Sequence, residues 1–198
     1  MFSLLEARLA GLRLRYAEPH RAYHGQAHVD AMLRGLHGLG AAVASPAAVE
    51  LAIWYHDAIY DPAARDNEAR SAALLLSELA GIAGPALLGA AALMVRLTAG
   101  HALTPEVPDA LREDCALFLD LDLAVLGAGT DAFDAYEAGI AREFAPVHGS
   151  VAFRVGRAAF LTGMLARPRL FHTERFHGAL DASARANLRR ARWALTRP

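Results

Sequence analysis

The stretch Ala47–Tyr60, with the sequence AAVELAIWYHDAIY, gives the strongest indication of the fold. It is mostly apolar, it does not alternate between apolar and polar residues as a half-buried strand does, and it contains many good helix formers. Ser45 and Pro46, directly before it, are typical of an N-cap and a first helical residue. We therefore expect a helix that carries His56 and Asp57 near its C-terminal end.

The rest of the chain shows the same character. No run of five residues alternates strictly, and the β-branched residues are scattered among helix formers. Apolar spacing, glycines and prolines place the further helices near residues 4–16, 26–39, 65–79, 85–98, 110–125, 132–144, 151–165 and 183–195. The sequence thus predicts an all-α fold, and we expect residues 1–198 to form a single domain.

Charge and hydropathy restrict the partners. Lys+Arg 20 nearly balance Asp+Glu 21, so the chain lacks the excess positive charge that an extended nucleic acid requires. The most apolar stretch, residues 83–95, is too short to span a bilayer and contains glycines and a proline. The chain has a single cysteine, Cys115, and its N-terminal residues do not resemble a secretion signal. We expect a cytoplasmic protein without a membrane partner.

Two adjacent metal-competent side chains, His56 and Asp57, follow the apolar residues Trp54 and Tyr55. Neighbouring side chains on a helix point about 100° apart, so both can reach one ion only if the ion lies beside that helix end. An imidazole and a carboxylate suit a divalent Mn, Fe, Co, Ni or Mg ion better than a structural zinc, which favours several cysteines. The sequence therefore predicts one divalent metal ion, with a second as an open alternative.

Two further regions could complete such a site. Upstream, His24 and His28 lie four residues apart before and within the expected second helix, which could pair with the third helix around one ion. Downstream, Asp120 and Asp122 interrupt an apolar segment, and buried carboxylates are costly unless they have a partner such as a metal. Because the two aspartates point about 200° apart on a helix, we expect only one of them to face the ion.

This ordered set of motifs resembles the HD superfamily of metal-dependent phosphohydrolases. The resemblance is carried by Tyr23–His28, Ile53–Asp61, Asp66–Glu68 with Ser71 and Ala72, and Asp120–Gly127. It implies an HD-domain helical bundle that hydrolyses a small phosphate ester, with nucleotides as the favoured substrate class.

The resemblance also implies the ligand set, namely His28, His56, Asp57 and one late aspartate. We expect that aspartate to be Asp122, because the last Asp of the superfamily is usually followed by an aliphatic stretch that starts a new helix. Asp120 is the alternative.

Other residues near these motifs are candidates for catalysis or substrate binding. Asp57 could also orient an attacking water, and Arg21 could contact a substrate phosphate. Glu68 is a candidate proton shuttle, although an acidic residue is also common in the first turn of a helix. His101 follows an apolar helix, where an imidazole is common for electrostatic reasons, but the resembling group also places a histidine there.

The role of His24 stays open at this point. It could contact substrate, orient His28, ligate a second metal, or be a histidine on a surface loop. Two other functions are also open. A di-iron HD-type oxygenase would need extra ligands such as His24, His101 and Asp61, and a non-catalytic module would bind a nucleotide or a partner with a structural metal.

Overall fold

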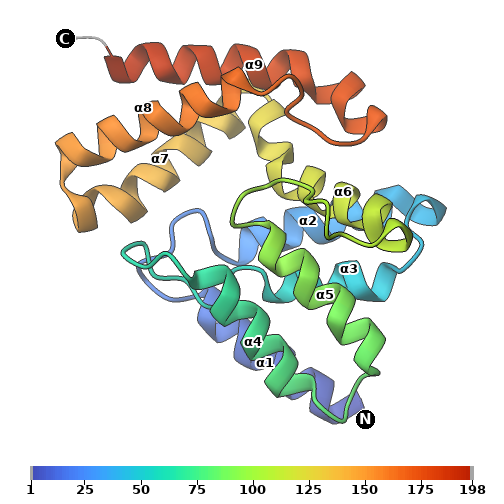
Figure 1. Cartoon of the computed structure of the whole chain (residues 1–198). Coiled ribbons are helices and arrows are strands. Elements are labelled where there is room, and N and C mark those ends of the chain that lie inside the picture. The colour runs from blue at the N-terminus through green and yellow to red at the C-terminus, as the bar shows by residue number, and fades with distance from the viewer. Residues whose placement is uncertain (1, 197–198) are drawn as a thin grey trace. The chain divides into compact units, whose positions relative to one another are not determined.

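The computed structural model describes the backbone of residues 2–196 and the side chains of residues 7–196. These residues form α-helices and two short 3-10 helices, and no strand occurs among them (Figure 1). In chain order the elements are α1 Phe2–Tyr16, α2 Gln26–Leu39, η1 Gly40–Ala42, α3 Pro46–Tyr55, α4 Asn67–Leu79, α5 Pro85–Leu97, α6 Asp109–Leu123, η2 Ala124–Gly127, α7 Thr130–His148, α8 Ser150–Ala166 and α9 Glu174–Thr196. The all-α prediction is confirmed.

Two compact units follow one another along the chain. The first ends at Leu121 and contains α1 to α5 and most of α6, and the second begins at Asp122 and contains η2 and α7 to α9. The boundary falls inside α6, so Asp122 continues a helix that starts in the first unit. That the whole chain is a single domain stays a prediction.

Helix α3 is the central element of the first unit. It contacts α1, α2, α4 and α5, and its residues Ala48, Val49 and Ala52–Tyr55 are at most 5% exposed. A helix that is apolar on all sides is expected to be surrounded by other elements. The same apolar run that predicts a helix from sequence therefore makes α3 the core of this unit.

The N-terminus of α3 begins at Pro46, as the sequence predicts, with Ser45 at the N-cap position. The side chain of Ser45 makes no capping hydrogen bond, however. The carboxylate of Asp114 in α6 instead accepts the backbone N–H groups of Ala44 at 2.9 Å and Ser45 at 2.7 Å. A buried carboxylate distant in sequence thus fixes the backbone just before α3, although it does not bond the N–H groups of the first helical turn.

The C-terminus of α3 lies at Tyr55, whereas the sequence pattern predicts a helix to Tyr60. Other segments hold the following residues out of the helix. Arg21 binds the backbone carbonyls of Asp57 and Ala58, and the Ser71 hydroxyl bonds both the N–H and the carbonyl of Ile59. These tertiary hydrogen bonds replace those that a longer helix would make.

In the second unit, α8 contacts both α7 and α9, and η2 packs against α9 (Figure 1). Helix α9 begins at Glu174, well before the expected start near residue 183. Asp181, in this additional part, accepts the backbone N–H of Leu170 at 3.0 Å and binds Arg185 at 2.6 Å. None of the helices in the described residues is long and apolar enough to cross a membrane.

Candidate metal centre

Three donor side chains meet where three helices approach one another. His28 lies in the first turn of α2, His56 is the C-cap residue of α3, and Asp122 is close to the C-terminal end of α6. One ligand atom of each lies within 4.8 Å of those of the others. Donors on opposite sides of an ion with bonds of about 2.1 Å are separated by about 4.2 Å. The spacing of this set therefore fits a single divalent ion with small side-chain adjustments.

The ring of His56 is oriented by the end of its own helix. The last carbonyls of a helix have no partner within it, and Nδ1 of His56 lies 2.9 Å from one of them, the carbonyl oxygen of Ile53. A carbonyl oxygen can only accept, so the ring donates an N–H from Nδ1 in this contact, and Nε2 is the nitrogen left to face an ion. That Nε2 lies 3.0 Å from Oδ2 of Asp57.

The ring of His28 is oriented by a residue of the loop before α2. The hydroxyl of Tyr23 lies 3.1 Å from Nδ1 of His28, and the rings of His28 and His56 are 5.2 Å apart at 70° to one another. Both histidines are buried, at 7% and 2% exposure. Each therefore has its Nδ1 engaged by the protein, which leaves Nε2 as the atom suited to a metal.

The two aspartates of α6 lie in different surroundings. Asp122 is half-buried and belongs to the group with His28 and His56, whereas Asp120 is fully buried and lies outside that group. The structure thus places Asp122 with the two histidines, and that Asp122 is the metal ligand stays a prediction. The carboxylate of Asp57 lies beside Nε2 of His56. That Asp57 is a fourth ligand stays a prediction.

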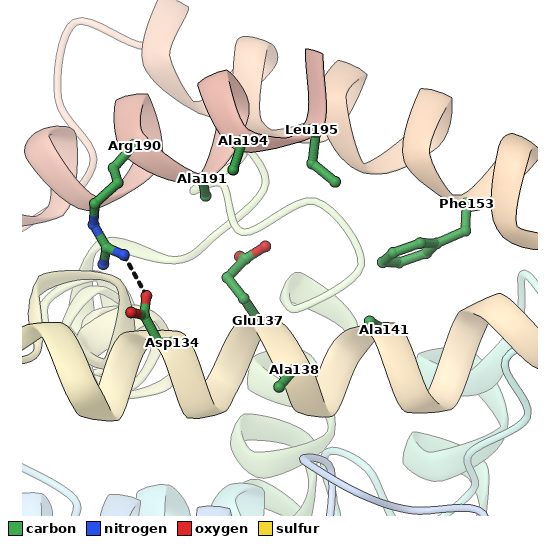
Figure 2. Close-up of a pocket in the computed structure, with 9 residues that line it drawn as sticks. All are labelled: Asp134, Glu137, Ala138, Ala141, Phe153, Arg190, Ala191, Ala194 and Leu195. Atoms are coloured by element: carbon green, nitrogen blue, oxygen red, sulfur yellow. Dashed lines mark hydrogen bonds and ion pairs between the residues drawn. The ribbon is translucent and has the colours of Figure 1, made fainter. Parts of the chain in front are cut away.

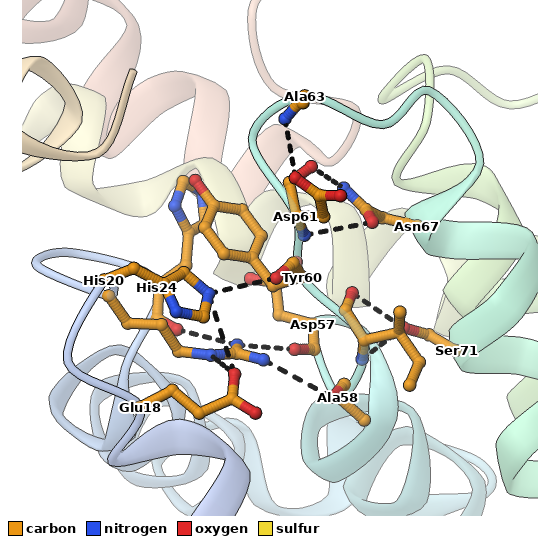
Figure 3. A network of polar contacts seen from close by, with 12 residues as sticks. Glu18, His20, His24, Asp57, Ala58, Tyr60, Asp61, Ala63, Asn67 and Ser71 are labelled. Carbon is orange, nitrogen blue, oxygen red and sulfur yellow. Dashed lines mark hydrogen bonds and ion pairs between the residues drawn. The ribbon is translucent and has the colours of Figure 1, made fainter. Parts of the chain in front are cut away.

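The segment Asp57–Asp61, which follows His56, is held by hydrogen bonds from two other parts of the chain (Figure 3). On one side, Arg21 donates to the backbone carbonyls of Asp57 and Ala58. On the other, Asn67 of α4 exchanges two hydrogen bonds with the backbone of Asp61. Asn67, in the motif Asp66–Glu68, therefore holds this segment against α4.

The other predicted site residues lie as follows. His24 is half-buried, with its ring stacked on Tyr60 at 4.5 Å and 6.3 Å from the ring of His28. Glu68 lies in the first turn of α4, and His101 follows α5 with a positive φ of 45°. None of these three belongs to the group of three donors. Their roles in substrate binding and proton transfer stay predictions.

Sequence reasoning missed Tyr23 as a partner of His28 and considered only His24 for that orienting role. Tyr23 opens the Tyr-His-x-x-x-His motif, and that position was the only signal for it. The side chain of Arg21 is 0% exposed and makes hydrogen bonds to Glu18, His24, Asp57 and Ala58. That it contacts a substrate phosphate stays a prediction.

Two other features offer little chemistry. Burial raises the pKa of the Cys115 thiol to about 11, and the carboxylate of Asp114 adds to this effect, so the thiol is a poor nucleophile near neutral pH. A groove of about 340 Å³ between α7 and α9 has mainly apolar walls, with Phe153 at one end (Figure 2). Its acidic residues already pair with arginines, Asp134 with Arg190 at 2.5 Å and Glu137 with Arg157.

Comparisons with protein-family models, with curated proteins and with solved structures find no match to this chain.

Proposed function

We propose that this chain is a metal-dependent phosphohydrolase with an HD-type helical bundle, and that it hydrolyses a small phosphate ester such as a nucleotide. The observation that carries the proposal is the meeting of His28, His56 and Asp122 within 4.8 Å. These residues come from three helices and appear in the order that the HD resemblance implies. The near-neutral charge of the chain favours a small phosphorylated substrate over an extended nucleic acid.

The donor set favours a divalent ion of hard or intermediate character in a site with open coordination positions. Two imidazoles with one or two carboxylates suit Mn, Fe, Co, Ni or Mg, and they leave coordination positions for other ligands. When bound, such an ion lowers the pKa of a coordinated water and neutralises charge on a phosphate group. Tyr23 and the Ile53 carbonyl hold the two imidazoles in the required orientation. We assign Asp57 as a ligand that also orients the attacking water.

For proton transfer we propose Glu68 and His101. The φ of 45° at His101 is a conformation that costs a residue other than glycine about 1–3 kcal/mol, and such strain is concentrated at functional sites. Glu68 lies in the first turn of α4, next to Asn67, which holds the turn after His56. If both act as general acids or bases, Glu68→Gln and His101→Ala reduce turnover by about 10² to 10⁴ without loss of metal.

The test is a phosphatase assay with matched histidine variants. The purified chain is assayed with Mn, Co, Ni and Mg against p-nitrophenyl phosphate, bis(p-nitrophenyl) phosphate and nucleoside mono-, di- and triphosphates. We expect hydrolysis that a chelator abolishes and added metal restores. His56→Ala should lose both metal and activity, whereas His37→Ala, an exposed histidine of α2, should lose neither.

Three other outcomes contradict the proposal in different ways. Metal bound at His56 without hydrolysis of any ester would favour a binding module with a structural metal. Two irons per chain with consumption of dioxygen would favour the oxygenase. Wild-type protein that binds no divalent metal would remove the basis for all three functions.

A further inference from the structure

We propose that Arg21 is a positioning residue that fixes the His56–Asp57 turn against the segment leading into His28, and that it does not contact substrate. The proposal deepens the proposed function, on which its metal-binding consequence rests. It begins from the burial of the side chain, which is 0% exposed although arginine is rarely buried without a partner. A phosphate of a bound substrate would have to displace the partners that surround it.

The guanidinium of Arg21 joins two segments that are distant in sequence. Nη1 donates to the carbonyl oxygens of His24 at 3.0 Å and Asp57 at 2.7 Å, and Nη2 donates to Ala58 at 3.3 Å. His24 directly precedes Gly25, the N-cap of α2, and Asp57 directly follows the C-cap of α3. One nitrogen atom therefore bridges the backbone just before the helix of His28 and the backbone just after His56.

The arginine is itself held in place from three directions. Its Nε donates to Oε2 of Glu18 at 3.0 Å, and its guanidinium carbon lies 5.2 Å from the ring centroids of both Tyr16 and Tyr60. Tyr16 in turn donates to the backbone carbonyl of Trp54 in the last turn of α3. A planar guanidinium can satisfy this set of partners at once, whereas an ammonium has fewer donors and no fixed plane.

The chain contains a matched control, because Arg185 in the second unit makes the same kinds of bonds. Its Nε donates to Asp181 at 2.6 Å, and its two Nη atoms donate to the backbone carbonyls of Leu165, Arg167 and Pro168. Arg185→Lys thus removes a comparable set of hydrogen bonds without touching the group of His28, His56 and Asp122. We expect Arg21→Lys and Arg185→Lys to lower the melting temperature alike.

The discriminating measurement is NMR of the imidazole ring nitrogens in protein with ¹⁵N-labelled histidine. Arg21→Lys should shift the ring resonances of His28 and His56, while Arg185→Lys should leave both unchanged. In parallel, Arg21→Lys should weaken the binding of Mn²⁺ or Co²⁺ by about 10- to 100-fold, as is typical when a group that orients metal ligands is removed. Arg185→Lys should bind metal as the wild type does.

Unchanged ring resonances in Arg21→Lys would overturn the positioning role. So would a raised KM for p-nitrophenyl phosphate with metal affinity intact, because that result would make Arg21 a substrate contact. If the wild-type chain binds no metal, the proposed function fails, but the ring resonances still decide the role of Arg21. If Arg21→Lys does not fold, Glu18→Ala removes the acceptor that holds Nε, and the same resonances should shift by smaller amounts. Their constancy in that variant would also overturn the proposal.

Discussion

The hydroxyl oxygen of Tyr23 lies 3.1 Å from Nδ1 of His28, and the two rings are 4.8 Å apart. If His28 ligates through Nε2, its Nδ1 carries the proton and donates it to the Tyr23 oxygen. Tyr23 then fixes the orientation of His28 as the Ile53 carbonyl fixes that of His56. The two imidazoles of the candidate centre are thus held by partners of different kinds, a side-chain hydroxyl and a backbone carbonyl.

The first prediction follows from this contact. Tyr23→Phe keeps the ring but removes the acceptor for Nδ1 of His28, so we expect the affinity for Mn²⁺ or Co²⁺ to fall by about 10- to 100-fold. Isothermal titration calorimetry measures this change directly. The fold should persist, because Tyr23 is a half-buried residue of a loop.

The matched control is Tyr55→Phe. Tyr55 also loses a hydroxyl hydrogen bond, at 2.9 Å to Glu78, and its pKa is raised by burial and by that carboxylate, but the bond connects α3 with α4 and not with a metal donor. This variant should lose stability and keep its metal affinity. If both variants bind metal as the wild type does, Tyr23 does not orient a ligand.

A second prediction concerns Asp114, the buried carboxylate that holds the backbone before α3. Asp114→Ala leaves the N–H groups of Ala44 and Ser45 without their acceptor, which should lower the free energy of unfolding by about 1–3 kcal/mol. Urea denaturation measures the change. Glu113→Ala, an exposed neighbour on the same helix, should stay within about 0.5 kcal/mol of the wild type. Equal losses in both variants would contradict this role of Asp114.

The helices of the chain were largely predictable from sequence, because glycines and prolines mark many of their ends. Gly40 follows α2 and Pro85 begins α5, and both ends agree with the sequence pattern. The early end of α3 was not predictable, since Arg21 and Ser71 bind the residues after it from other parts of the fold. Tertiary hydrogen bonds of this kind leave no periodic signal in the sequence.

In the candidate centre too, only some of the residues could be predicted from sequence. His28, His56 and the acidic pair on α6 stand out because ionisable residues interrupt apolar runs. The partners of the two imidazoles do not stand out, because one is a backbone carbonyl and the other is a tyrosine of a loop. For Arg21, sequence identifies a cation near the motif, but only its burial separates a positioning role from a contact with substrate.

A third prediction concerns the pH dependence of the stability that Asp181 contributes in the second unit. Burial by itself raises the pKa of Asp181, but hydrogen bonds from Arg185 and the Leu170 N–H, with the nearby charges of Arg185 and His177, lower it below its ordinary value. A depressed carboxyl pKa contributes stability above the unfolded-state value of about 3.9, and this stability is lost as the pH falls through the folded-state pKa.

Asp181→Asn should therefore be less stable than the wild type at pH 7, and the two unfolding free energies should converge as the pH falls below about 4. Urea titrations between neutral and acidic pH measure the convergence. Asp131→Asn, an exposed acid of α7, is the control and should follow the wild-type profile. A difference for Asp181→Asn that is constant over the whole range would argue against the lowered pKa.

The last prediction separates the two aspartates of α6. Asp122 belongs to the donor group and is half-buried, so Asp122→Asn replaces a charged ligand with a neutral amide and should weaken Mn²⁺ binding by about tenfold or more. Asp120 is fully buried and outside the group, so Asp120→Asn should mainly lower the free energy of unfolding, by about 1–3 kcal/mol, while metal affinity stays near the wild-type value. Calorimetric metal titration and urea denaturation on both variants give the two quantities independently. The reverse ranking of metal affinities would move the ligand to Asp120 and would require α6 to present its opposite face to His28 and His56.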